Sequence, residues 1–276
     1  MLTLAAALAL HGRLKHEPRD YPASRLHRRP MTRFCAFALF VLALAPGPAC
    51  ADSARIAVAA NFRTVLAALQ PVFETETGHD ITVVSGSTGK LYAQIVNGAP
   101  FDVFLAADQA RPLRLEADGR AAGRFTYAVG RLVLWDPAGV AVGPDRLRSG
   151  EDRRLAMANP DLAPYGAAAA EVLAALGLVD RTHPKKVLGE NIGQAFAFVQ
   201  TGNAEIGFVA LSQMLSSPAA GAGAYWTPPQ KLYTPIRQDA VLLARAADNP
   251  AAAAFMAFLQ GARAQALIED HGYGRE

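Results

Sequence analysis

Cysteine and histidine are scarce in this sequence. Its 276 residues include two cysteines, Cys35 and Cys50, and both precede the position at which the mature chain is expected to begin. The mature protein is therefore predicted to have no disulfide, no thiolate nucleophile and no sulfur ligand for a metal. Its three histidines, His79, His183 and His271, lie far apart and have no metal-ligand spacing. We expect neither a metal centre nor a cofactor.

The N-terminal region also lacks a hydrophobic run long enough to cross a membrane. The apolar segment at residues 34–45 has twelve residues, fewer than the roughly 20 needed to span the hydrocarbon core. Arg33 precedes this segment, and the small residues Ala49-Cys50-Ala51 follow it. A basic residue, a short apolar stretch and a small-residue cleavage site form a secretory signal peptide. The sequence therefore predicts export to the periplasm and cleavage after Ala51.

The true start and the fate of Cys50 are separate questions. Residues 1–30 contain six basic side chains and no periodic apolar pattern after Leu10. Because a signal peptide normally begins at the initiator methionine, Met31 is the predicted start. Cys50 also permits a lipoprotein in which this cysteine is acylated. Gly47 and Pro48 stand where such signals usually have aliphatic and small residues, which favours cleavage without a lipid anchor.

The basic character of the full sequence comes from its N-terminal segment. The formal net charge is +3, but seven of the 27 basic and two of the 24 acidic residues lie in residues 1–51. The mature chain therefore has 20 basic and 22 acidic residues. Without a positive excess, neither nucleic acid nor an anionic membrane is an expected partner.

Short β-branched runs alternate with longer alanine-rich segments, which predicts an α/β fold with a largely parallel sheet. We expect strands at residues 55–60, 81–84, 103–106, 131–135, 155–158, 186–188, 206–210 and 239–244, and helices at 62–76, 91–96, 108–118, 167–176, 193–201, 250–260 and 262–268. A glycine- and proline-rich loop at 137–144 separates two such units. The predicted organisation is residues 1–51 as upstream extension and signal peptide, 52–134 plus 238–276 as one lobe, and 135–237 as a second.

Four loops that lead into predicted helices are rich in glycine, hydroxyl and amide residues, at positions 59–61, 85–89, 159–166 and 191–193. The first turn of a helix has N–H groups without internal partners and a partial positive charge of roughly half a unit, which favours an anion. The side chains of Asn61, Ser87, Thr88 and Tyr165 add neutral hydrogen-bond donors. We predict that these loops meet in a cleft between the lobes and hold an oxyanion without a formal cation.

Other interpretations of these loops remain open. Taken singly, Asn61, Ser87 and Asn191 are explained as N-caps, and Tyr165 as a packing residue. Residues 86–90 (GSTGK) lack the first glycine and the final hydroxyl residue of a phosphate-binding loop, and residues 85–89 lack the first glycine of a serine-hydrolase elbow. A periplasmic enzyme on the same scaffold is the alternative from another class, and we expect no enzyme because no nucleophile, acid–base pair or metal cluster is recognisable.

Several short motifs occur in an order shared with one family. They are VAANF at residues 58–62, SGSTGKL at 85–91, QI at 94–95, NGAPFDVF at 97–104, ADQ at 107–109, GRLVLW at 130–135, NP at 159–160, APYG at 163–166, GFVA at 207–210 and GY at 272–273. Their order and spacing resemble the molybdate-binding protein family, ModA, over essentially the whole mature chain.

The resemblance implies a type II periplasmic binding protein fold, with two α/β lobes joined by a two-stranded hinge and the ligand in the cleft. It implies molybdate or tungstate as ligand, an ABC transporter permease as membrane partner and a monomeric state. Carried over by position, the ligand contacts fall on Asn61, Thr88, Tyr165 and the backbone N–H of Ile192, with Ala60 and Ser87 as weaker candidates. Sulfate or phosphate on the same frame is the alternative ligand.

Three positions depart from the enteric pattern of this family. Asn61 replaces a serine of the first loop, Ala210 stands where a tyrosine supplies a hydroxyl, and Tyr165 stands where that pattern has alanine. The hypothesis is that one phenolic donor has moved between loops while the number of donors is kept. Replacing Tyr165 by phenylalanine would then weaken oxyanion binding by about 1.5 to 3 kcal/mol.

Overall fold

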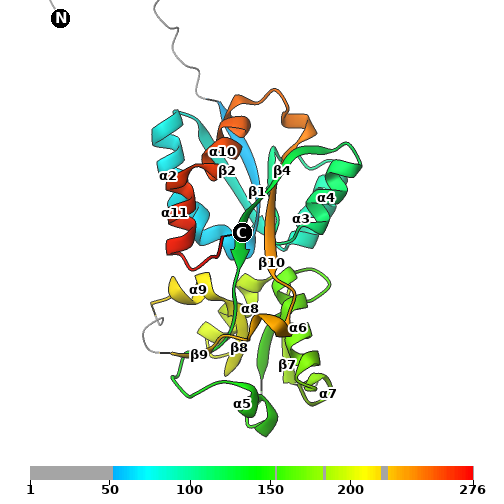
Figure 1. Ribbon diagram of the computed structural model, residues 1–276, viewed down its shortest axis with the longest axis vertical. Coiled ribbons are helices and arrows are strands. Elements are labelled where there is room, and N and C mark those ends of the chain that lie inside the picture. Colours follow the sequence, from blue (N-terminus) through cyan, green and yellow to red (C-terminus); the bar gives the residue numbers. More distant parts are fainter. Residues whose placement is uncertain (1–51, 153, 183–184, 219–222, 276) are drawn as a thin grey trace, which may run out of the picture. The chain divides into compact units, whose positions relative to one another are not determined.

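Two mixed five-stranded sheets, each flanked by helices, make up the computed structural model (Figure 1). It describes residues 52–152, 154–182, 185–218 and 223–275, all of which belong to one compact unit. The predicted upstream extension, the signal peptide and His183 lie outside these residues. None of the described helices is by itself long and apolar enough to cross a membrane, although α10 (Pro250–Gln260) and α11 (Ala262–Asp270) together meet that test with a 63° bend between them.

The first sheet has the strand order β2-β1-β3-β10-β4. Its strands are β1 (Ser53–Ala59), β2 (Asp80–Gly86), β3 (Val103–Leu105), β4 (Ala121–Gly130) and β10 (Ile236–Leu243). Strands β2, β1 and β3 are parallel, whereas β10 runs antiparallel to both β3 and β4. The accompanying helices are η1 (Ala60–Phe62), α2 (Arg63–Thr77), α3 (Thr88–Val96), α4 (Ala110–Ala117), η4 (Ala244–Ala246), α10 and α11.

The second sheet, of order β7-β6-β8-β5-β9, repeats this arrangement. Its strands are β5 (Leu132–Asp136), β6 (Leu155–Ala158), β7 (Lys186–Gly189), β8 (Ile206–Ala210) and β9 (Ala224–Trp226). Again three strands are parallel, β7, β6 and β8, and β5 runs antiparallel to β8 and β9. The helices are α5 (Pro144–Ser149), α6 (Pro164–Ala175), α7 (Val179–Thr182), α8 (Ile192–Gln200), α9 (Leu211–Leu215) and η3 (Gln230–Leu232).

Both faces of each sheet are covered, because successive side chains of a strand point to opposite faces. In β1, Ile56 and Val58 belong to the core that includes residues of α2, α10 and α11, whereas Ala57 belongs to the core on the side of α3 and α4. Figure 1 shows these two helix groups on either side of the sheet. In β5, Leu134 packs with residues of α6 and Trp135 with residues of α8 and α9.

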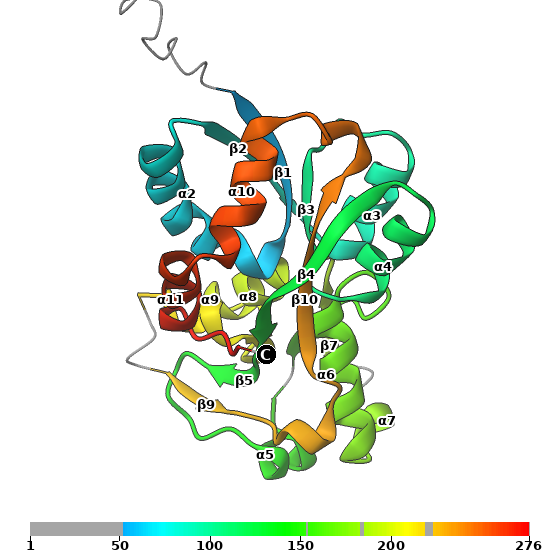
Figure 2. The same cartoon turned by 45° about the horizontal axis from the view of Figure 1, so that its top comes forward.

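The chain passes twice between the sheets at neighbouring places. Strand β4 ends at Gly130 and β5 begins at Leu132, so Arg131 alone separates the two. Strand β10 returns to the first sheet, and its first residue, Ile236, pairs with Gly130 (Figure 2). The two crossing segments therefore lie side by side, which is the geometry of a hinge.

The structure differs from the sequence prediction in detail. Strand β5 pairs within the second sheet, so the predicted boundary after residue 134 falls inside a strand of that sheet. Strands β4 and β9 were not expected, and both lie antiparallel at a sheet edge. Strand β4 contains Gly123 in the left-handed region and lacks a β-branched run, so its pairing with β10, rather than intrinsic propensity, makes it a strand.

Candidate functional site

Four loops from the two halves of the molecule meet at one small cavity. Its volume is about 10 Å³. The six residues predicted as ligand contacts all line it: Ala60, Asn61, Ser87, Thr88, Tyr165 and Ile192. They are joined by Ala59, Gly86, Ala107, Ala163, Pro164 and Asn191. Ligand sites for organic molecules usually measure roughly 300 to 1,000 Å³, so this cavity is too small for an organic ligand.

Three helices begin at this cavity. Helix α3 starts at Thr88, α8 starts at Ile192, and α6 starts at Pro164 with Tyr165 in second position. Within the described part of the chain, the backbone N–H groups of Thr88, Tyr165 and Ile192 have no hydrogen-bond acceptor. Unpaired N–H groups at helix N-termini favour an anion, both by direct hydrogen bonds and through the helix dipole.

Side chains hold these helix starts in place. The Ser87 side chain accepts a hydrogen bond from the Lys90 N–H (3.4 Å), and Asn191 accepts one from Gln194 (3.1 Å). Both are N-cap contacts, so the capping interpretation of Ser87 and Asn191 is correct. It is compatible with a ligand site, because the cap satisfies the third N–H of the helix and leaves the first one for the cavity.

The Thr88 hydroxyl can serve the site directly. Its Oγ1 accepts a hydrogen bond from the backbone N–H of Ala107 at 3.2 Å, and Thr88 is 1% exposed. A hydroxyl has one proton to donate, and no acceptor for the Thr88 proton is present among the described residues. The bond from Ala107 therefore orients a hydroxyl whose remaining donor is available to a bound oxyanion.

The Asn61 side chain has a different role from the one expected. Its Nδ2 donates to Gln238 Oε1 at 2.8 Å and to the Tyr273 hydroxyl at 2.9 Å, which uses both amide protons. Tyr273 in turn donates to the Asn61 carbonyl oxygen (3.0 Å). The backbone of Asn61 is therefore the part of the residue that is left for a ligand in the cavity. Its side chain anchors the loop to Gln238 and Tyr273.

The Tyr165 hydroxyl is likewise directed to the hinge. It accepts a hydrogen bond from Gln238 Nε2 at 3.2 Å, and a Cβ atom built on Gly130 would lie 2.2 Å from it. Gly130 is therefore required to leave room for this hydroxyl. Burial raises the pKa of Tyr165 well above its usual value, so the phenol stays neutral and does not repel an anion. The bond from Gln238 uses the hydroxyl oxygen as acceptor and leaves its proton, as at Thr88, so the relocated phenolic donor stays a prediction.

Among the described residues, no charged side chain lines the small cavity, but one lies beside it. A neighbouring cavity of about 500 Å³ shares Ala60 and Asn191 with the site and is also lined by the exposed Arg63. None of the ion pairs between described residues involves Arg63. This wider space lies next to the site and places the positive charge of Arg63 beside it.

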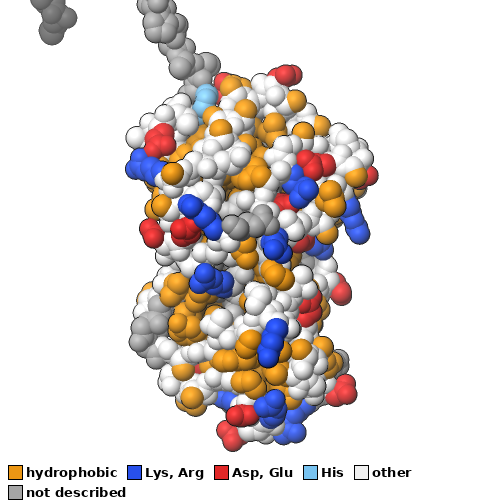
Figure 3. Space-filling view, in the orientation of Figure 1, with side chains coloured by type: hydrophobic (Ala, Val, Ile, Leu, Met, Phe, Trp, Pro, Cys, Tyr) orange, Lys and Arg blue, Asp and Glu red, His pale blue; other side chains and the backbone are white. Residues whose placement is uncertain are grey.

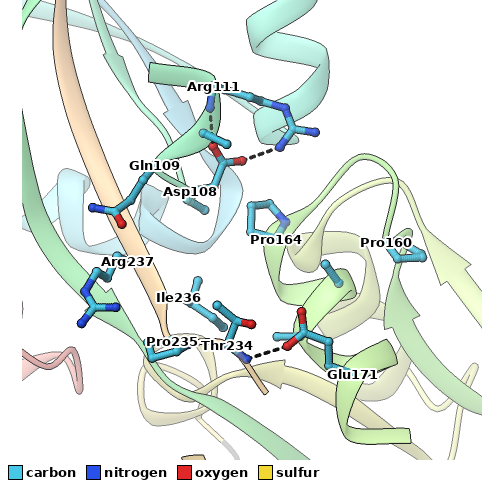
Figure 4. A pocket seen from close by; sticks show the side chains of 14 residues that line it. Asp108, Gln109, Arg111, Pro160, Pro164, Glu171, Thr234, Pro235, Ile236 and Arg237 are labelled. Atoms are coloured by element: carbon cyan, nitrogen blue, oxygen red, sulfur yellow. Dashed lines mark hydrogen bonds and ion pairs between the residues drawn. The ribbon is translucent and has the colours of Figure 1, made fainter. Parts of the chain in front are cut away.

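A second neighbouring cavity, of about 310 Å³, shares Ala107 and Pro164 with the site (Figure 4). The carboxylates of Asp108 and Glu171 line it. Asp108 pairs with Arg111, and Glu171 accepts a hydrogen bond from the Thr234 N–H at 2.5 Å. Arg111 and Arg237 line the same cavity, so its charges of the two signs balance, and the three helix starts make the small cavity the better oxyanion site.

Direct bonds close the two halves over the site. The Gly89 N–H donates to the Leu162 carbonyl oxygen at 3.0 Å, and Lys90 forms an ion pair with Glu190 at 2.5 Å. A Cβ atom on Gly89 would lie 3.1 Å from the Leu162 oxygen, so the close approach depends on glycine. Lys90, considered above only as part of an incomplete phosphate-binding motif, therefore bridges the halves.

Sequence reasoning missed Gln238 and Tyr127 and gave Tyr273 no role beyond the family motif. Gln238 is 0% exposed, and its Oε1 accepts from Asn61 and from the Tyr127 hydroxyl (3.0 Å). A polar run, Arg237-Gln238-Asp239, inside a strand whose other residues are apolar was the available signal.

Comparison with known proteins fits this geometry. The family model described as bacterial extracellular solute-binding protein matches residues 54–274. The molybdate-binding protein ModA of Azotobacter vinelandii is 49% identical over 242 residues, which cover 85% of this chain and 96% of the relative. The ModA protein of Rhodobacter capsulatus is 45% identical, covering 83% and 91%. The solved structure of the Azotobacter vinelandii periplasmic molybdate-binding protein aligns with a TM-score of 0.77 and 39% identity, covering 81% of this chain and 99% of that one. The chain therefore belongs to the ModA family of bacterial extracellular solute-binding proteins.

Proposed function

We propose that this protein captures molybdate, and also tungstate, and delivers it to the membrane permease of an ABC transporter. The observation that supports this most directly is that three helices begin at one cavity whose described lining residues are all neutral. Two relatives that share 49% and 45% of their residues with this chain are molybdate-binding proteins. The protein acts as a binding protein and carries out no reaction.

The donors proposed for the ion are the backbone N–H groups of Asn61, Thr88, Tyr165 and Ile192, together with the Thr88 hydroxyl. Ala60 and Ser87 remain weaker candidates. A doubly charged tetrahedral anion has four acceptor oxygens, and a set of donors that converge from both halves replaces its hydration shell. Because these donors are fixed before binding, little ordering is needed when the ion enters.

Phosphate is the less suitable ligand of the alternatives. Near neutral pH it carries at least one proton, which needs an acceptor, and no carboxylate lines the small cavity. Sulfate has no such proton, and its exclusion depends on cavity size alone.

The cellular setting follows from the family and the N-terminal sequence. We propose a periplasmic, monomeric protein that begins at Met31, loses its signal peptide after Ala51 and presents its closed form to the permease. Figure 3 shows acidic and basic side chains interspersed on the visible face, without a large area of one sign, which agrees with the absence of nucleic acid among the proposed partners.

The decisive experiment is titration calorimetry of the mature protein with molybdate, tungstate, sulfate and phosphate, with thermal melting as a second measurement. We expect the first two anions to bind and to raise the melting temperature in proportion to the logarithm of their concentration over Kd. Tight binding of sulfate without binding of molybdate would contradict the proposed ligand and identify the protein as a sulfate-binding protein. No binding of any of the four would contradict an oxyanion site.

A further inference from the structure

Gln238 lies behind the cavity rather than in its lining, and its side-chain amide joins residues from three elements. Its Oε1 accepts from Asn61 Nδ2 at 2.8 Å and from the Tyr127 hydroxyl at 3.0 Å, and its Nε2 donates to the Tyr165 hydroxyl at 3.2 Å. All four side chains are at most 1% exposed. Because a buried polar group is costly unless it is hydrogen-bonded, each of these contacts matters for its partners.

The orientation of the Gln238 amide is determined by its neighbours. Asn61 Nδ2 is itself a donor, and its second proton goes to Tyr273. Rotating the Gln238 amide by half a turn would place two NH₂ groups against each other. The amide oxygen therefore faces Asn61 in the first half, and the amide nitrogen faces Tyr165 in the second half.

The position of Gln238 along the chain makes it a link between the two halves. It lies in β10, whose Ile236 packs in the core of the second sheet while Ala240 packs in the core of the first. Asn61 belongs to η1 of the first half, and Tyr165 belongs to α6 of the second. Both residues line the cavity, and both side chains end on the same amide.

We infer that Gln238 is a positioning residue for the bound anion. It holds the Asn61 loop and the first turn of α6 at the separation that an oxyanion needs, without touching the ion. This inference rests on the proposed oxyanion-binding function. Its physical basis is that the ligand is bound mainly by backbone N–H groups, whose positions are set by the side chains that anchor their loops.

The test compares Gln238→Met, which keeps the length of the side chain but loses its hydrogen bonds, with Tyr165→Phe and the double variant. We expect molybdate to dissociate about tenfold faster from Gln238→Met in stopped-flow measurements, the equivalent of one to two neutral hydrogen bonds. Molybdate should dissociate from the double variant little faster than from Gln238→Met alone, since both changes remove the same contact between residues 165 and 238. Tyr165→Phe leaves β10 intact and keeps the test informative if Gln238→Met folds poorly.

Thr182→Val is the matched control, because it removes a buried hydroxyl that donates to the Leu178 carbonyl oxygen (2.8 Å) away from the site. It should lower the melting temperature and leave the dissociation rate unchanged. Two results would overturn the inference. One is a molybdate dissociation rate of Gln238→Met within twofold of that of the unmodified protein. The other is a double variant whose rate increase equals the product of the increases in Gln238→Met and Tyr165→Phe.

Hydrogen exchange of the ligand-free protein separates this inference from the proposed function. In Gln238→Met, the amides of residues 59–62 and 165–168 should both exchange faster, and those around Thr182 should not. If no oxyanion binds the unmodified protein, the proposed function fails, while unchanged exchange in both segments would still refute the role of Gln238.

Discussion

At the scale of single residues, the site combines two kinds of contribution. Asn61 uses both side-chain amide protons to fix its loop and leaves its backbone for a ligand. Ser87 and Asn191 accept N-cap bonds through their side-chain oxygens. The buried Thr88 hydroxyl is oriented by the Ala107 N–H and keeps a proton to donate. The most informative single substitution therefore lies at Thr88.

Replacing Thr88 by valine removes a donor to the anion and leaves the Ala107 N–H without its acceptor. We expect oxyanion binding to weaken by about 1.5 to 3 kcal/mol, as for a hydrogen bond to a charged group. Thr88→Ser retains the hydroxyl and should bind within about threefold of the unmodified protein. Calorimetry on both variants decides this, and equal affinities for valine and serine would remove the Thr88 hydroxyl from the site.

Tyr165→Phe tells two roles of this hydroxyl apart. The Tyr165 hydroxyl accepts a hydrogen bond from the neutral Gln238 amide at the hinge. Loss of that contact alone should weaken oxyanion binding by about 0.5 to 1.5 kcal/mol, the range of a neutral hydrogen bond. A loss above that range in calorimetry would return the hydroxyl to direct contact with the anion.

At the scale of elements, binding depends on how closely helix starts from the two halves approach each other. Helix α3 meets the loop before α6 through the Gly89–Leu162 bond, at a distance that a side chain would disturb. The ion pair between Lys90 and Glu190 spans the same gap, but both side chains are too exposed for it to contribute more than about 1 kcal/mol.

Valine at Gly89 should hold the two halves apart. Its Cβ atom would lie 3.1 Å from the Leu162 oxygen and 3.2 Å from Arg111 Nη2. We expect a loss of about 1 to 3 kcal/mol in anion binding, the usual cost of overpacking, and a larger radius of gyration in X-ray scattering with ligand. Ala93→Val, on the exposed face of the same helix, is the control and should change neither the affinity for the anion nor the radius of gyration. Unchanged scattering and affinity for Gly89→Val would show that α3 and the Leu162 loop need not meet.

At the scale of the whole molecule, buried tyrosines link stability to pH. Burial raises the pKa of Tyr127 and Tyr165 well above 10 and that of Tyr273 to about 12. In the unfolded chain these groups ionise near pH 10, so above that pH the unfolded state loses protons that the folded state retains. Their contribution to stability is complete below about pH 10 and is lost as the pH rises toward 12.

Urea unfolding between pH 8 and pH 11 measures this effect. The free energy of unfolding should be level up to about pH 9.5 and fall above it, and Tyr273→Phe should reduce the slope of the fall. The phenylalanine variant is also less stable at pH 8, because the Asn61 and Ser212 side chains lose a partner. Equal slopes for both proteins would show that Tyr273 ionises as freely when folded as when unfolded.

The charge of Arg63 beside the site is expected to act at long range, on the rate at which the ion encounters the protein. Arg63 lines the cavity of about 500 Å³ beside the site without touching the small one. Arg63→Gln should slow association of the anion roughly two- to fivefold at low ionic strength, with little change in dissociation. The difference should vanish in high salt, because screening removes the attraction. A slower association rate that persists in high salt would indicate a structural effect instead.

Much of the site was predictable because its signals are local. Helix starts, caps and small-residue loops are decided by neighbouring residues, so the sequence placed Thr88, Tyr165 and Ile192 in loops that lead into helices, and the helices begin one to three residues earlier than predicted. The return of the chain to the first lobe was also predicted. Strand β4 and the contacts of Gln238 were not predictable in this way, because strand pairing and buried hydrogen bonds join residues more than a hundred positions apart.

The sequence by itself determined the α/β class, the resemblance to one family and the neutral, anion-favouring chemistry of the loops, since composition and short-range spacing encode these. The tertiary structure alone decided which atoms remain available to a ligand. The fold directs both amide protons of Asn61 to Gln238 and Tyr273, away from a ligand, and it places the Gln238 amide against the oxygen of the Tyr165 hydroxyl. The physical reason is that a buried donor or acceptor takes whichever partner packing brings within reach, and packing depends on the whole chain.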